Sequence, residues 1–489
     1  MRRLLLTAFL WSLLARPGLG QDLSPEVHRF VKVEASVVAL THLRVVDGTG
    51  STARQDQTII LRGGKIESVG DSATISLPPH AEVMDLQNHT VIPGLVGMHN
   101  HMYYRSSIHR DAEGHIPNLG ISSAEIPFTA PRLYLAGGVT TMRTAGSNEP
   151  YADLNVKRQI ETGKLVGPKM DVTGPYLEGP SPVYVEMHEL RGPEDARKDV
   201  EYWAGQGVTS FKAYMHITRA ELAAAIDAAH KLGLKITGHL CAVGYREAIA
   251  MGIDNLEHGP IFSDSEFDSN KQPDVCPPLA SSYIGWARTD VSSPQVQELI
   301  HDLVAHEVAI TSTLPVFEQL IPGRPTLQER VLEAMAAESK VSYLEQRTRG
   351  GSGALGLTVP WEQLLKKEME FERAFVKAGG LLLAGPDPTG IGGVLPGFGD
   401  QREVELLVEA GFSPVEAIHI ATSNGAQYLG QLDHIGTISV GKQADLVVIK
   451  GDPSQKIEDI ENVEIVFKDG IGYDSAKLIE SVRGQVGIR

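Results

Sequence analysis

Eight short apolar runs alternate with helical segments along the middle of this 489-residue chain. Strands that alternate with helices are typical of a parallel sheet whose strands are joined by crossover helices. The runs lie at residues 91–99, 138–146, 169–175, 207–215, 235–240, 254–260, 308–317 and 380–388. Eight such units in succession predict an α/β fold of the (β/α)8 TIM-barrel type.

Two β-rich segments flank the predicted barrel. In the first, short alternating strands are separated by the turn dipeptides Asp47-Gly48 and Gly63-Gly64. The second repeats this pattern near the C-terminus. Neither is long enough to bury both faces of a sheet alone, so we expect the two to combine into one small β-sandwich. The predicted domains are the first sandwich part at 36–90, the barrel at 91–430, and the second sandwich part with a C-terminal tail at 431–489.

The N-terminal residues 1–20 resemble a secretory signal peptide. Arg2 and Arg3 precede an apolar stretch at 4–15, and small residues lead to Gly20. We therefore expect a secreted or periplasmic mature chain, with an uncleaved anchor as the alternative. No later apolar run reaches 18 residues, so the mature chain is expected to have no membrane span.

The formal net charge of −17 argues against a nucleic-acid partner. Binding to phosphates requires a concentrated basic surface, and an excess of acidic groups repels them. A solvated acidic surface is the simpler interpretation of this charge.

The chain contains only two cysteines, Cys241 and Cys276. Two cysteines cannot form a disulfide framework, although export permits a single bridge. Cys241 follows His239 by two residues, which allows a thiol near the site. Packing as a small core residue is the favoured interpretation.

Six side chains with metal-binding chemistry stand at the predicted C-terminal ends of the barrel strands. His99 and His101 are two residues apart, so on a strand they point to the same face. The other four are Lys212, His239, His258 and Asp387. Any one histidine alone would more often be a packed or surface residue. A barrel closes its strand ends into a ring, however, which brings all six together.

The motifs around these residues, HNH, SFKAY, ITGHL, LEHG and AGPDP, occur in the order found in the amidohydrolase superfamily, which the chain resembles over nearly all its mature length. LEHG is most similar to the imidazolonepropionase and prolidase-like branch. SFKAYM is equally similar to the hydantoinase form of the fourth strand.

The resemblance implies two divalent metal ions, with zinc as the default for such ligands. His99, His101 and Asp387 would bind the more buried ion, and His239 and His258 the second. Lys212 would bridge the ions after reaction with carbon dioxide, because a carbamate is stabilised by two cations whereas an ammonium is repelled. A lysine that extends to solvent is the alternative for Lys212.

Two metal ions that share a water can generate a hydroxide at neutral pH. Asp387 would then act as general base and acid. The resulting reaction would be hydrolysis of an amide-like C–N bond, as in a dipeptide or an N-acyl amino acid. The alternatives are a lactonase or other ester hydrolase, a mononuclear deaminase, or, from a different class, a non-catalytic binding protein. A homo-oligomer is also possible.

Four residues are weaker candidates for contacts with a small-molecule or dipeptide substrate. Arg143 is followed by Thr144, where related sequences usually have an acidic residue. Arg143 would bind a substrate carboxylate, although a structural role inside the barrel is favoured. Tyr214 lies two residues beyond Lys212, and Tyr103 follows the first strand. His188, in a predicted loop, is the weakest candidate.

Overall fold

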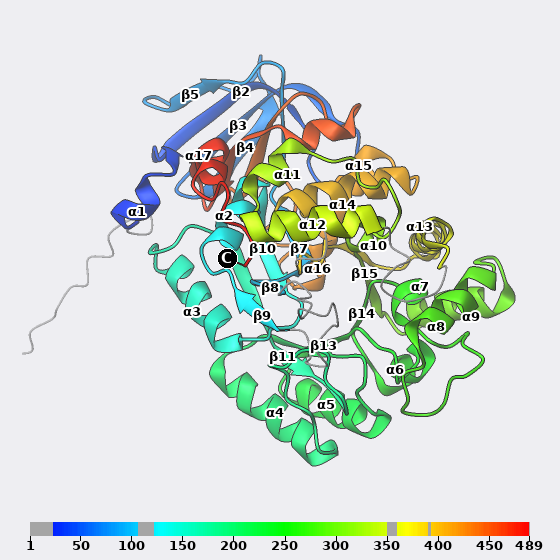
Figure 1. Ribbon diagram of the computed structural model, residues 1–489. Helices are drawn as coiled ribbons and strands as arrows, with labels where there is room; N and C mark the ends of the chain where they lie inside the picture. The colour runs from blue at the N-terminus through cyan, green and yellow to red at the C-terminus, as the bar shows by residue number, and fades with distance from the viewer. Residues whose placement is uncertain (1–22, 106–121, 350–358, 390–392, 489) are drawn as a thin grey trace, which may run out of the picture.

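The computed structural model describes residues 23–105, 122–349, 359–389 and 393–488. These residues form a barrel of strands and helices, with a mixed sheet built from both ends of the chain lying beside it (Figure 1). The predicted signal peptide lies outside the described residues. None of the described helices is long and apolar enough to cross a bilayer.

The barrel contains eight parallel strands in the order of the sequence, which confirms the predicted TIM barrel. Its strands are β7 (Leu95–Asn100), β10 (Val139–Thr144), β11 (Lys169–Leu177), β12 (Ser210–Ala213), β13 (Lys235–Gly238), β14 (Asn255–Glu257), β15 (Ala309–Ser312) and β16 (Leu382–Ala384). Each lies within or overlaps one of the eight predicted runs. The backbone N–H of Asp387 donates to the carbonyl of His99 at 3.0 Å, which joins the end of β16 to the end of β7 and helps to close the ring.

Helices follow the barrel strands and cover their outer face (Figure 1). In chain order they are α2 (Thr129–Ala136), α3 (Pro150–Glu161), α4 (Pro193–Gln206), α5 (Arg219–Lys231), α6 (Tyr245–Met251), α7 (Pro260–Ser263), α8 (Leu279–Arg288), α9 (Pro294–Ala305), α10 (Leu314–Glu318), α11 (Glu329–Ala334), α12 (Ala337–Arg349), α13 (Trp361–Lys377), α14 (Phe398–Glu409), α15 (Pro414–His419) and α16 (Gly425–Tyr428). A π-helical turn, η1 (Ile420–Asn424), joins the last two.

Two predicted runs differ from the observed strands. The run at 91–99 is divided at Gly94 into two strands that belong to different sheets. A Cβ at Gly94 would lie 2.0 Å from Thr140 Oγ1, so only glycine fits where the chain crosses between them. The run at 308–317 ends its strand at Ser312 and then becomes α10, because Pro315 lacks an N–H and suits the first turn of a helix.

The second sheet combines N- and C-terminal strands, as predicted for a β-sandwich. Its strands follow the order β1-β19-β18-β17-β6-β2-β3-β4, and β5 also pairs with β2. They are β1 (Val31–Val33), β2 (Val37–Val45), β3 (Arg54–Arg62), β4 (Lys65–Asp71), β5 (Glu82–Asp85), β6 (His89–Pro93), β17 (Leu446–Lys450), β18 (Val463–Lys468) and β19 (Ile471–Asp474). Three short helices, α1 (Pro25–His28), η2 (Ile457–Glu461) and α17 (Ser475–Glu480), and the hairpin of β8 (Tyr103–Arg105) with β9 (Ser123–Glu125) complete the described elements.

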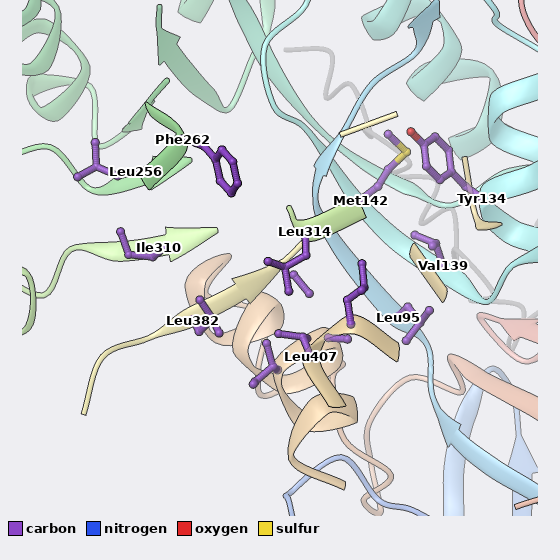
Figure 2. Close-up of a cluster of buried hydrophobic side chains, with 14 of the residues drawn as sticks. Leu95, Tyr134, Val139, Met142, Leu256, Phe262, Ile310, Leu314, Leu382 and Leu407 are labelled. Carbon is purple, nitrogen blue, oxygen red and sulfur yellow. The ribbon is translucent and has the colours of Figure 1, made fainter. Parts of the chain in front are cut away.

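Buried apolar side chains fix the barrel strands against the helices. Leu95, Met142 and Ile310 on strands belong to one continuous core with Tyr134 and Leu407 on helices (Figure 2). A separate apolar cluster fills the sandwich. Since the strands are held from outside, their C-terminal ends provide a rigid platform for polar side chains.

Candidate metal centre

The structure brings the six predicted metal-ligating residues to the C-terminal end of the barrel. His99 lies in β7 and Lys212 in β12, and His101 follows β7 directly. His239, His258 and Asp387 follow β13, β14 and β16. His258 and Asp387 have positive φ angles of 69° and 53°. Such strained backbone in non-glycine residues is concentrated at functional sites.

His99, His101 and Asp387 form one cluster of possible ligands. Asp387 Oδ1 lies 3.2 Å from His101 Nε2 and 3.5 Å from His99 Nε2. One donor atom from each residue lies within 4.8 Å of the others. Two imidazole nitrogens and a carboxylate oxygen suit a divalent transition metal such as zinc.

His239 and His258 lie beside this cluster. Their ring centroids are 4.4 Å apart, and the ring of His258 lies 4.6 Å from that of His99. His258 Nδ1 is 2.7 Å from the hydroxyl of Thr313, while its Nε2 is buried and has no hydrogen-bond partner among the described residues. A buried nitrogen without a partner is costly, and a metal ion would satisfy it.

Lys212 lies against His99. Its Nζ is 3.2 Å from His99 Nε2, and the side chain is almost completely buried. Burial lowers the pKa of Lys212 to about 8. The uncharged amine, which is the form that reacts with carbon dioxide, is therefore within reach near neutral pH.

Burial keeps the histidines of the site uncharged. It lowers the pKa of His99 to about 4 and that of His239 to about 3, and it holds the pKa of His258 well below the usual range. Neutral imidazole is the metal-binding form of histidine. Burial would raise the pKa of Asp387, but His99 and His101 outweigh it and hold the pKa well below the usual value.

The sequence analysis missed Glu257, which supports His99 from inside the barrel. His99 Nδ1 lies 2.7 Å from Glu257 Oε2, and Arg143 donates to Glu257 Oε1 at 2.7 Å. A carboxylate at Nδ1 fixes the proton there and leaves Nε2 free to bind a metal. A signal was available, because Glu257 is an acidic residue at the end of a predicted barrel strand, directly before His258.

Arg143 and His188 do not occupy the substrate positions suggested for them. The Arg143 guanidinium is buried in the barrel and donates to Glu257, Asn255 and the carbonyl of Met98. These contacts match the structural role rather than carboxylate binding.

His188 is half exposed and lies 3.0 Å from Asp195 at the start of α4. It is therefore engaged outside the cluster of histidines.

Tyr103 and Tyr214 do reach the site, where Tyr176 and Tyr184 join them. Tyr103, Tyr176 and Tyr184 form a buried cluster against which the partly buried Tyr214 packs, and the four are called the tyrosine cluster below. The Tyr103 and Tyr176 hydroxyls are 2.7 Å apart, and the Tyr214 ring is 5.1 Å from that of His239. Burial holds the pKa of Tyr103, Tyr176 and Tyr214 well above the usual range, so they remain uncharged.

Cys241 and Cys276 form a disulfide, with their Cα atoms 4.9 Å apart. The single bridge that export permits is therefore present, so Cys241 is not a free thiol near the site. Cys241 is buried, but it is bonded to a residue of the segment that follows α7. Sequence spacing could not show that these loops lie together.

Comparisons with known proteins agree with this fold. The model of the amidohydrolase family matches residues 398–471. A curated adenine deaminase of Carboxydothermus hydrogenoformans is 42% identical over 57 residues, which is 12% of this chain and only 9% of the deaminase.

Two solved structures are similar over most of their length. A Xaa-Pro dipeptidase with bound methionine in its active site has a TM-score of 0.64 and 20% identity, over 90% of this chain and 100% of the dipeptidase. A bottromycin amidohydrolase has a TM-score of 0.65 and 18% identity, over 92% of this chain and 91% of the other. At this level of identity the likeness establishes the fold.

Proposed function

Because residues 398–471 match the amidohydrolase family model and the barrel gathers the candidate ligands at one end, we propose that this chain is a binuclear metal-dependent hydrolase that cleaves an amide-like C–N bond. The proposed substrates are dipeptides or N-acyl amino acids. The dipeptidase among the similar structures supports this class, since it places a peptide-cleaving site on the same fold.

The observation that carries the proposal is the convergence of four uncharged histidines, Lys212 and Asp387 at one end of the barrel. His99, His101 and Asp387 would hold one ion, and His239 and His258 the other. Zinc fits this mixture of imidazole and carboxylate donors. When bound, such ions polarise a carbonyl and lower the pKa of water, which is the chemistry that amide hydrolysis requires.

Lys212 would complete the site as a carbamate. Its neutral amine forms a bond to the carbon of carbon dioxide and releases one proton, which leaves an anionic group at the end of the side chain. The position of Nζ, 3.2 Å from His99 Nε2, supports this role because a permanent ammonium there would repel cations.

Asp387 is the proposed general base and acid. Its carboxylate is ionised and is 14% exposed, whereas the side chains of His99 and His101 are each 1% exposed. It would accept a proton from the attacking water at one carboxylate oxygen and return it to the leaving nitrogen.

Arg105 and the tyrosine cluster support a substrate that carries a carboxylate. Arg105 follows Tyr103 by two residues on β8 and therefore points to the same face. Its backbone N–H donates to the carbonyl of Thr389, two residues after Asp387, at 3.0 Å. No acidic side chain pairs with Arg105 within the part of the chain that the structure describes. Its guanidinium would bind the substrate carboxylate, the role that was the less favoured alternative for Arg143.

Metal content and turnover of a Lys212→Ala variant test the function. Wild-type protein should contain about two zinc ions per chain. The variant should lose at least one ion, and its rate of dipeptide hydrolysis should fall by more than about 100-fold. That is a larger loss than is typical when a residue that only orients a metal ligand is replaced. Lys235→Ala is the matched control, because Lys235 begins the neighbouring strand at the opposite end of the barrel.

A single bound ion in wild-type protein, or a Lys212→Ala variant that keeps both metal and activity, would favour a mononuclear deaminase instead. The short match to an adenine deaminase is the observation in favour of that alternative. Assays with dipeptides, N-acyl amino acids, lactones and adenine separate the reaction classes.

We also propose that the protein is exported. The disulfide supports this, because disulfides persist in oxidising compartments. Mass spectrometry of the native protein should find an N-terminus near residue 21 and oxidised cysteines. Protein that retains Met1 and carries two free thiols would contradict export.

A further inference from the structure

The Cys241–Cys276 disulfide lies beside the half of the metal centre formed by His239 and His258. Cys241 follows His239 by two residues, and Cys276 lies between α7 and α8. The two cysteines are 35 positions apart, and the chain between them includes β14 and His258. One histidine therefore directly precedes the bridged segment, and the other lies within it.

The peptide after His239 is held on its inner side by the neighbouring part of the barrel. The N–H of His239 donates to the carbonyl of Ala213 at 3.0 Å, and the N–H of Ala242 donates to the carbonyl of Met215 at 2.8 Å. These bonds connect the peptide to the end of β12, the strand that carries Lys212. The carbonyl groups of Cys241 and Ala242 accept hydrogen bonds from a different segment.

The outer side of the same peptide is held by the segment that ends at Cys276. Ser265 Oγ donates to the carbonyl of Cys241 at 2.6 Å. Lys271 Nζ donates to the carbonyls of Cys241 and Ala242 at 2.5 and 2.7 Å. Residues 264–276, which lie between α7 and the disulfide, are called the outer segment below. Together with the disulfide, these bonds attach the outer segment to the peptide that follows His239.

Apart from the disulfide, the outer segment is held mainly by polar contacts, such as the Arg219–Asp274 ion pair and the hydrogen bonds that Ser281 and Ser282 donate to Asp268. Residues 269, 270 and 272–275 are exposed, and the described chain between α7 and α8 forms no helix or strand of its own. Its main apolar anchor is Phe267, whose ring lies 4.5 Å from that of Trp286. An exposed irregular segment of this kind depends strongly on a covalent cross-link.

Building on the two-metal function proposed above, we propose that this disulfide is a redox-sensitive brace for the His239–His258 half of the metal centre. In the oxidised protein the brace holds both imidazoles in position for the second ion. Reduction by a dithiol releases the outer segment and weakens binding of that ion, while the His99–His101–Asp387 cluster is retained. Partners that orient ligands typically change metal affinity by about 10- to 100-fold.

The reduction is a two-electron thiol–disulfide exchange. A thiolate of the dithiol attacks the sulfur of Cys276, which is half buried, whereas Cys241 is only 3% exposed. The S–S bond breaks, and the electron pair leaves on the Cys241 sulfur, which takes up a proton. The second thiol of the reductant then displaces Cys276 as a thiol, and the reductant leaves as a cyclic disulfide.

The test compares zinc binding by oxidised wild-type protein with that of a Cys241→Ser/Cys276→Ser double variant. Competition with a chromogenic chelator reports the number of ions and their affinities. We expect the double variant to bind the second zinc ion at least about tenfold more weakly and the first unchanged. Asp274→Asn is the matched control, because it removes an exposed ion pair with Arg219 from the same segment and leaves the disulfide intact.

A second measurement, made on wild-type protein, tests the proposal even if the double variant does not fold. Zinc-loaded wild-type protein is treated with a trialkylphosphine, which reduces the disulfide without the zinc chelation of a dithiol, and zinc release to the same chromogenic chelator is followed. Release of about one ion per chain is expected. Two ions retained with unchanged affinity after complete reduction would overturn the brace alone. A single ion in the untreated oxidised protein would overturn the two-metal function and the brace together.

Discussion

Replacement of Glu257 by glutamine should damage both the stability of the barrel and its affinity for metal. Glu257 and Arg143 are almost completely buried, at 0% and 1% exposure. The carboxylate accepts from Arg143 at 2.7 Å and from Thr237 at 2.5 Å, and it lies 2.7 Å from His99 Nδ1. An amide has one oxygen instead of two, so at least one of these buried donors must lose its acceptor.

The size of the effect follows from the charge left behind. Removing one partner of a buried ion pair costs about 3–5 kcal/mol, because the remaining charge stays in the interior without compensation. The weaker orientation of His99 should reduce metal affinity by about 10- to 100-fold. That loss corresponds to about 1.4–2.7 kcal/mol, since each factor of ten is about 1.4 kcal/mol.

Urea unfolding of the metal-free protein and chelator competition measure the two effects separately. Glu372→Gln is the matched control, because burial raises the pKa of Glu372 to about 8 and its carboxyl group is already neutral at pH 7. The free energy of unfolding of the control should lie within about 1 kcal/mol of the wild-type value, because the substitution is conservative. A loss for Glu257→Gln no larger than this would refute the reasoning.

A double-mutant cycle with Arg143→Met makes the test stricter. Once Arg143 is absent, the glutamine no longer leaves a buried charge unpaired. The double variant should therefore be more stable than the sum of the single losses predicts, by about 0.5–3 kcal/mol, the range found for residues in contact. Additive losses would show that the Glu257–Arg143 pair does not act as a unit.

Two further predictions concern substrate binding and pH. Arg105→Met should raise KM for an N-acyl amino acid by about 10-fold or more and leave hydrolysis of the corresponding amide unchanged; equal effects on both substrates would rule out carboxylate recognition. In the metal-free protein, burial lowers the pKa of His99 from 6.5 to about 4, so the unfolded chain takes up a proton below pH 6.5 that the folded chain does not bind. The stability from this group is therefore fully present above pH 6.5 and falls by about 2 kcal/mol between pH 6.5 and pH 5. Urea midpoints should show a shallower pH dependence in His99→Asn, and identical slopes would contradict this assignment.

The convergence of the candidate ligands could be predicted from sequence because strand geometry limits where their side chains can point. His99 and His101 share a face by alternation, and Lys212, His239 and Asp387 occupy the ends of runs that the barrel must bring together. The same logic located Tyr103 and Tyr214. These inferences needed only the order of the strands.

Other features depend on contacts between distant segments, which local patterns do not encode. The structural role favoured for Arg143 is observed, but its partner could not be predicted because Glu257 is 114 positions away. The pairing of Cys241 with Cys276 depends on how two loops lie in space. The division at Gly94 follows from the pairing of β6 with β17, whose residues lie at opposite ends of the sequence.

That pairing also sets an order of assembly during synthesis. Residues 89–93 of β6 acquire their neighbours in β17 only after residues 446–450 have left the ribosome. Until then β6 presents an open edge, which favours misassociation with other chains. β6 continues through Gly94 into β7, the strand that bears His99. We therefore expect the metal centre to become complete only when nearly the whole polypeptide has been made.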